Sequence, residues 1–170
     1  MSKHLQVGVT GEYFVAYYLS SLELKVTLLH GGASDVDILA CSADGSRVCS
    51  VQVKTARSAA CNSWYAMGKG RKWQIRKDHS PSRDKWYALV DLNVKTNEQP
   101  MCIFVPSTWI NQFGRDGEKM SFFHLVDSVI QQVQDSKVFE KYMVEGKPVE
   151  ESFWTLPEEN ERALADKREE

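Results

Sequence analysis

Hydrophobic residues recur at helical spacing near the start of the chain. Val15, Leu19 and Leu22 follow an i, i+4, i+7 pattern, which is typical of a helix that buries one face. Thr10 precedes this stripe and is of a residue type that caps helix N-termini. The pattern therefore predicts a helix over residues 10–22.

Apolar runs separated by turn residues predict a sheet after this helix. Asp44 and Gly45 stand between two such runs, and Asp-Gly between alternating hydrophobic segments is typical of a β-hairpin. The predicted strands are residues 25–29, 35–41, 47–55, 86–92 and 101–105. Helices are predicted over residues 107–113 and within residues 125–143. This order indicates an α/β domain over residues 1–156, followed by an acidic tail over residues 157–170.

Composition excludes several classes of protein. With 170 residues, 42% hydrophobic and 26% charged, the chain can form one core without disulfides, which excludes a disordered chain or a disulfide-stapled miniprotein. The four cysteines form no Cys-x-x-Cys pair, which argues against a structural zinc site. There is no signal-peptide pattern and no apolar run of membrane-spanning length, so we expect a cytoplasmic protein without a membrane partner.

The charge is unevenly distributed along the chain. The net charge is −2, yet residues 54–85 carry nine basic and two acidic side chains, or +7. Residues 134–170 carry six basic and eleven acidic side chains, or −5. The basic stretch is either a solvated loop or a surface that contacts phosphates. Trp64 and Trp73 lie within it and are either core residues or residues that stack on bases.

The hairpin gathers side chains that could carry chemistry. Residues two apart in a strand share a face, so Asp35 lies with Asp37, and Gln52 lies with Lys54. A hairpin can therefore bring carboxylates beside an amide and a lysine. An antiparallel sheet with one face in water would show the same pattern.

Glu12 adds a carboxylate on the apolar stripe of the first helix. An unpaired buried charge is costly, so a metal, a lysine or hydrogen-bond donors should face it. Alternatively, Glu12 complements the positive end of the helix dipole.

Together these residues resemble the site of the PD-(D/E)xK nuclease superfamily. The resemblance rests on Gly11-Glu12 in a helix, on Asp37 in Asp-Ile-Leu-Ala, and on Val51-Gln-Val-Lys-Thr55 after a turn. It is nearest to small intron-encoded homing endonucleases and looser to Mrr-like restriction nucleases. It implies a restriction-endonuclease-like core, in which a helix is followed by a central mixed five-stranded sheet with flanking helices.

The resemblance also implies residue roles around Mg²⁺ or Mn²⁺. Asp37, Gln52 Oε1 and the Val53 carbonyl would hold the cation, and Glu12 would bind it directly or through water. Lys54 would stabilise the transition state of phosphodiester hydrolysis. Ser34-Asp35 replaces the Pro-Asp pair of the family name, so Asp35 is an alternative ligand. Gln52 replaces an acidic residue, which predicts weaker metal binding.

The resemblance implies a Mg²⁺-dependent DNA endonuclease, and the basic stretch would then contact its DNA. The residues predicted to do so are Arg57, Lys69, Arg71, Lys72, Arg76 and Lys77. Cutting both strands favours a homodimer. One alternative is a catalytically inactive nucleic-acid-binding module, or a subunit of a larger complex, on the same fold. Another is an interaction protein whose acidic tail binds a basic partner.

Overall fold

Five strands form the main sheet. The computed structural model describes residues 3–29, 35–61, 70–75, 81–95, 98–113, 121–155 and 157–158. The strand order is β1-β2-β3-β6-β7, and β3 and β6 pair in parallel whereas the other neighbours are antiparallel. This confirms the predicted mixed five-stranded sheet and its hairpin. The strands are β1 (Lys25–Leu28), β2 (Ile38–Cys41), β3 (Val48–Ala56), β6 (Lys85–Asp91) and β7 (Met101–Pro106).

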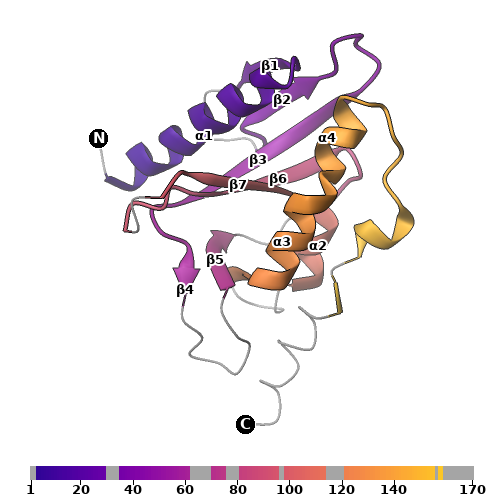
Figure 1. Ribbon diagram of the computed structural model, residues 1–170. Coiled ribbons are helices and arrows are strands. Elements are labelled where there is room, and N and C mark those ends of the chain that lie inside the picture. Colours follow the sequence, from indigo (N-terminus) through magenta and orange to yellow (C-terminus); the bar gives the residue numbers. More distant parts are fainter. Residues whose placement is uncertain are drawn as a thin grey trace.

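Helix α1 (Lys3–Ser21) lies across one face of this sheet (Figure 1). Val15 and Leu19 are fully buried, as their spacing predicts. The predicted start at Thr10 is wrong, because the helix begins at Lys3. The Thr10 hydroxyl donates a hydrogen bond of 2.8 Å to the carbonyl of Gln6, a bond that threonine makes inside helices.

A second sheet covers part of the opposite face of the main sheet (Figure 1). It consists of β4 (Ala60–Cys61), β5 (Gly70–Ile75) and β8 (Ser121–Val126), in the order β4-β5-β8. Trp73 of β5 is 1% exposed, and its Nε1 donates a hydrogen bond of 2.9 Å to the carbonyl of Val90. Trp73 is therefore a core residue and not a base-stacking one, whereas Trp64 lies outside the described residues.

The remaining helices complete the layers. Helix α2 (Ser107–Phe113) has the predicted bounds. The helix predicted within residues 125–143 is two helices, α3 (Asp127–Ser136) and α4 (Val138–Met143), separated by Lys137 with a φ of 48°. A 3₁₀ turn, η1 (Glu151–Trp154), follows.

Two hydrophobic cores lie on either side of the main sheet. One joins α1 and α4 to the sheet, and the other joins the second sheet, α2 and α3 to its opposite face. Strand β6 is buried along its whole length between them. Across the described ranges, no helix is long and apolar enough to cross a membrane.

Candidate active site

Asp37 lies where three strands meet, just before β2. Its N–H donates a hydrogen bond to the carbonyl of Val51 on β3 at 3.0 Å. Its carbonyl accepts one from the N–H of Leu29, just after β1, at 2.8 Å. Because both peptide groups are engaged, the backbone fixes the direction in which the carboxyl group leaves the sheet.

The carboxyl group of Asp37 accepts two hydrogen bonds from β3. The Gln52 side chain donates through Nε2 to Oδ2 at 2.6 Å, and the N–H of Val53 donates to the same oxygen at 2.7 Å. Gln52 is 8% exposed, so its amide is held in place by its surroundings. The structure thus brings Asp37, Gln52 and Val53 together.

Burial raises the pKa of Asp37 above its ordinary value of 3.8, and the charge of Asp35 adds to this. The Val53 N–H, the Lys54 ammonium and the Gln52 amide act in the opposite direction. The net direction is upward, so this carboxylate is not fully compensated by its neighbours. A cation beside it would favour the ionised form.

The oxygens at this position fit a hard divalent cation. Asp37 Oδ1 accepts no hydrogen bond from the described residues, and Gln52 Oε1 lies on the same amide that reaches Asp37. A half-turn of that amide would present Oε1 in place of Nε2, and amide and carboxylate oxygens are ligands that Mg²⁺ and Mn²⁺ accept. Val53 contacts Asp37 through its N–H and not through the carbonyl oxygen that the resemblance implies as a ligand.

Glu12 is placed differently from these residues. Val51 and Val53 share the core of α1, so Gln52 and Lys54, which alternate with them along β3, point to the other face of the sheet. Glu12 is half-buried on α1. Within the described part of the chain, no three His, Cys, Asp or Glu side chains form a metal-binding group. The structure therefore does not gather Glu12, Asp35 and Asp37 around one point.

The contact between α1 and β3 beside the site is unusually close. A Cβ added at Gly11 would overlap the side chain of Thr55, the residue after Lys54. Glycine is required here for the close approach of the helix, not for its backbone dihedrals. From the sequence alone, Gly11 stands out only as the neighbour of Glu12, because nothing in the sequence shows which strand residue faces the helix.

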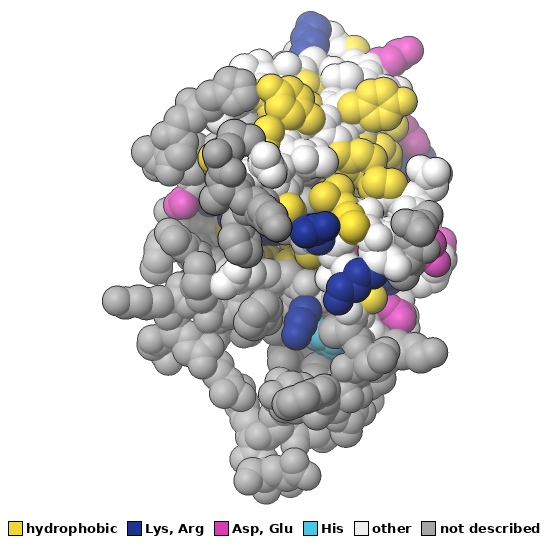
Figure 2. Space-filling model, turned by 90° about the vertical axis from the view of Figure 1, so that its left-hand side faces the viewer, with side chains coloured by type: hydrophobic (Ala, Val, Ile, Leu, Met, Phe, Trp, Pro, Cys, Tyr) yellow, Lys and Arg dark blue, Asp and Glu magenta, His cyan; other side chains and the backbone are white. Residues whose placement is uncertain are grey.

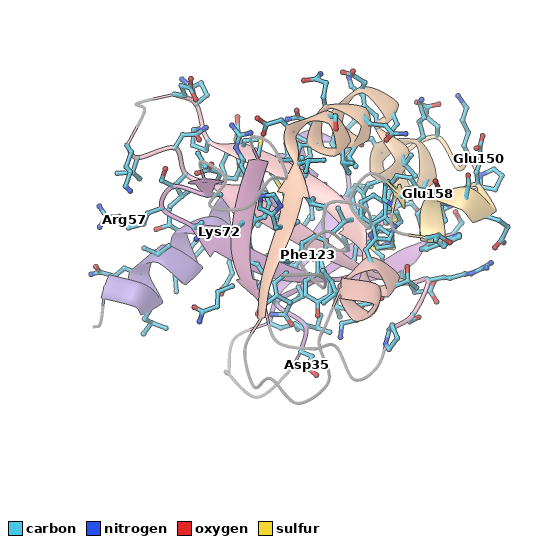
Figure 3. The ribbon with its side chains drawn as sticks, turned by 90° about the horizontal axis from the view of Figure 1, so that it is seen from below. Asp35, Arg57, Lys72, Phe123, Glu150 and Glu158 are labelled. Carbon is cyan, nitrogen blue, oxygen red and sulfur yellow. The ribbon has the colours of Figure 1, made fainter. Side chains whose placement is uncertain are left out.

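The residues predicted to contact DNA fall into three groups: exposed residues, residues outside the described ranges, and Arg71, which is neither. Arg57 and Lys72 are exposed, and Figure 3 shows them toward the same side of the molecule. Asp35 is also exposed and lies apart from them at the periphery (Figure 3). Lys69, Arg76 and Lys77 lie outside the described residues.

Arg71 is half-buried and pairs with two carboxylates instead. Its Nε lies 3.2 Å from Oδ2 of Asp91, which is fully buried, and its Nη1 lies 3.3 Å from Oδ1 of Asp127. Arg71 thereby joins the second sheet to the main sheet and to α3. This pairing replaces the phosphate contact that the sequence predicts for Arg71, because the guanidinium compensates a buried carboxylate.

Comparison with known proteins adds evidence on the fold. No protein-family model matches the chain, and no characterised protein matches it by sequence. Among the solved structures similar to it is a bacterial homing endonuclease, I-Ssp6803I. The TM-score is 0.51 and the identity 12%, over 81% of this chain and 98% of that one. At this identity the similarity shows a shared nuclease-like α/β fold and assigns no role to any residue.

Proposed function

We propose that this chain is a metal-dependent DNA endonuclease of the PD-(D/E)xK type. The observation that carries the proposal is the Asp37 carboxylate, held by Gln52 and Val53 on the sheet face that also bears Lys54. The structural similarity to a homing endonuclease supports the same class of function. The resemblance to PD-(D/E)xK nucleases suggests which reaction these residues would carry out. In the structure, three of the residues, Asp37, Gln52 and Val53, lie in contact.

Each residue has a part in the proposed reaction. Asp37 and Gln52 would hold Mg²⁺ or Mn²⁺ through their side-chain oxygens. When bound, the cation lowers the pKa of water and offsets charge on the phosphate. Lys54 would orient the scissile phosphate and stabilise the negative charge that develops on it.

Plasmid cleavage tests the proposal. Wild type should cleave supercoiled DNA with Mg²⁺ or Mn²⁺ and not with EDTA. Asp37→Asn and Lys54→Ala should each lose about 100-fold or more in rate, because Asp37→Asn weakens the cation site and Lys54→Ala removes a positive charge at the phosphate. Lys141→Ala, at an exposed position of α4, should cleave like wild type. Thermal melts establish that each variant is folded.

Two results would overturn the proposal. One is the absence of metal-dependent cleavage by wild type on duplex, single-stranded and branched DNA and on RNA. The other is Asp37→Asn cleaving as fast as wild type.

One observation favours a non-cleaving DNA-binding module as the second candidate. The Gln52 amide donates to Asp37, so the carboxylate already has a partner without any metal. This candidate predicts salt-dependent DNA binding that persists in EDTA and in Asp37→Asn, with no cleavage by wild type.

We also propose that two copies act together on duplex DNA, since each copy carries one candidate site and a duplex has two strands. Linear product formed without accumulation of nicked circles would support this. Nicked circles as the only product would contradict it.

A further inference from the structure

The two faces of strand β5 differ in character. Trp73 and Ile75 are buried in the core beneath the second sheet, whereas Lys72 and Gln74 are exposed. Successive side chains of a strand point to opposite faces, so Lys72 and Gln74 stand side by side on the outer face. This face carries long polar side chains with the donors that recognise base edges.

The neighbouring strand adds a third polar group to this face. Lys72 pairs with His124 across the antiparallel β5–β8 ladder, and directly opposed residues share a face. A Cβ at Gly70 would lie 2.9 Å from Cε1 and Nε2 of His124, so the imidazole lies close against the glycine. An added Cβ would also overlap the carbonyl oxygen of Leu125, so glycine at this position allows the half-buried ring and the neighbouring strand to approach closely.

The β5–β8 pair has dimensions that suit the major groove of DNA. Both strands have six residues, whereas β4 has two, so the surface is essentially a two-stranded ribbon. A major groove about 12 Å wide admits such a ribbon. Lys72 and Gln74 lie roughly 6.6 Å apart along the strand, close to two base-pair steps of about 3.4 Å.

The surroundings of the ribbon favour DNA. Arg57 and Lys72 lie toward the same side (Figure 3), and Figure 2 shows Lys and Arg side chains following one another down this side, with a His side chain beside the lowest. β5 also contacts β3, the strand that carries Gln52 and Lys54. The ribbon therefore packs against the strand that carries two residues of the candidate site.

We propose that the outer face of the β5–β8 ribbon reads base sequence in the DNA major groove, with Lys72, Gln74 and His124 contacting base edges. This inference rests on the proposed function, because it assigns the specificity of the same site. The amide of Gln74 suits adenine, and the ammonium of Lys72 suits guanine.

The experiment is selection of binding sites from randomised duplex DNA, carried out in EDTA so that no cleavage occurs. Wild type should enrich a defined sequence. Gln74→Ala should bind that sequence about 10-fold more weakly and lose preference at one base pair, while its affinity for random duplex changes less than about twofold. Gln131→Ala, an exposed glutamine on α3, should bind and select like wild type.

A second variant tests the reading directly. Gln74→Lys should change the preferred base at that one position from adenine to guanine. A third variant, Lys72→Ala, should bind both the selected sequence and random duplex DNA more weakly. It should also reduce the dependence of affinity on salt, because it removes a cation near the phosphates.

The outcomes separate this inference from the proposed function. If Gln74→Ala and Gln74→Lys select the wild-type sequence while wild type binds and cleaves DNA, the inference fails and the proposed function stands. Equal binding of wild type to duplex RNA, whose major groove is deep and narrow, would also contradict the inference. If wild type enriches no sequence from the random pool but still cleaves DNA, the inference fails and the proposed function stands. If wild type neither binds nor cleaves any nucleic acid, both fail.

Discussion

Asp37 is the residue whose charge state determines what the candidate site can bind. Its carboxyl group is partly desolvated, and the hydrogen bonds from Gln52 and Val53 compensate only part of the cost. A protonated Asp37 would lose affinity for a cation. Metal binding should therefore strengthen as pH rises through the raised pKa of Asp37.

The raised pKa of Asp37 makes a prediction for folding stability. A carboxyl group with a raised pKa in the folded chain favours folding fully below its ordinary value of 3.8, and this contribution is lost as pH rises through the folded pKa. Asp37→Asn does not ionise and still accepts from Val53. In EDTA, it should melt at or above the wild-type temperature at pH 7, and this difference should vanish below pH 3.8.

Circular-dichroism melts across this pH range would measure the effect. A variant that melts well below wild type at pH 7 and matches it only in acid would show that the charged form stabilises the fold, contrary to the account.

Gln52 carries the second residue-scale prediction. Gln52→Glu should bind Mn²⁺ about 10-fold more tightly, since it adds a negative oxygen ligand. Without metal it should melt at a lower temperature, because its carboxylate replaces a donor that lies 2.6 Å from Asp37. Calorimetry and melts with and without Mn²⁺ test both parts, with Gln131→Glu as the matched control. Unchanged affinity for Mn²⁺ would remove Gln52 from the ligand set.

At the scale of elements, the packing of α1 on β3 determines whether the site keeps its geometry. Gly11→Ala should destabilise the fold by roughly 1–3 kcal/mol, because the added methyl group overlaps Thr55. Gly8→Ala, one turn earlier with no atom within 4 Å of the added Cβ, should stabilise it by roughly 0.5–1 kcal/mol. Urea unfolding compares the two variants. Equal effects would mean that the helix does not approach β3 so closely.

Substitutions of Arg71 and Lys72, neighbours on β5, should differ in their effects on stability and on DNA binding. Arg71→Ala should cost about 3 kcal/mol of stability, because it leaves the buried carboxylate of Asp91 without its cation. Lys72→Ala should change stability by less than about 0.5 kcal/mol, since the side chain is exposed. Of the two, only Lys72→Ala should reduce the salt dependence of DNA binding. The reverse pattern, measured by urea unfolding and DNA titration, would contradict the assignment of Arg71.

Prediction from sequence succeeded where local signals were strong. The hairpin of β2 and β3 follows from Asp44-Gly45 and from the apolar runs beside it, and the length of α2 follows from Ser107 and the residues after it. The second sheet was missed because β5 is short and basic and pairs with β8 about fifty residues later. The burial of β5 depends on contacts with segments that are distant in the sequence, and a local sequence pattern does not reveal these contacts.

In the candidate site too, local patterns predict some features, whereas others depend on how the elements pack together. Strand alternation correctly placed Gln52 and Lys54 on one face, but it did not show that the Gln52 amide donates to Asp37. The helix pattern placed Glu12 toward the sheet and did not show that α1 covers the face opposite Gln52. Which side of a sheet a helix covers is a property of the assembled fold.

At the scale of the whole molecule, the near-neutral total charge conceals separate regions. The net charge is −2. One cation of the basic stretch is neutralised within the fold, since Arg71 pairs with Asp91 and Asp127. The exposed cations Arg57 and Lys72 lie toward one side (Figure 3). Such a local gathering of cations on one side can attract a polyanion even when the total charge is near zero.

We propose that Asp37, just before β2, and Gln52, on β3, form a site for a divalent cation that serves a nuclease. Calorimetric titration of Mn²⁺ tests it most directly, before any DNA substrate is chosen. Wild type should show a specific binding event that is lost in Asp37→Asn and kept in Asp135→Asn, at an exposed position of α3. Mn²⁺ binding of equal affinity and heat in wild type and Asp37→Asn would contradict the account.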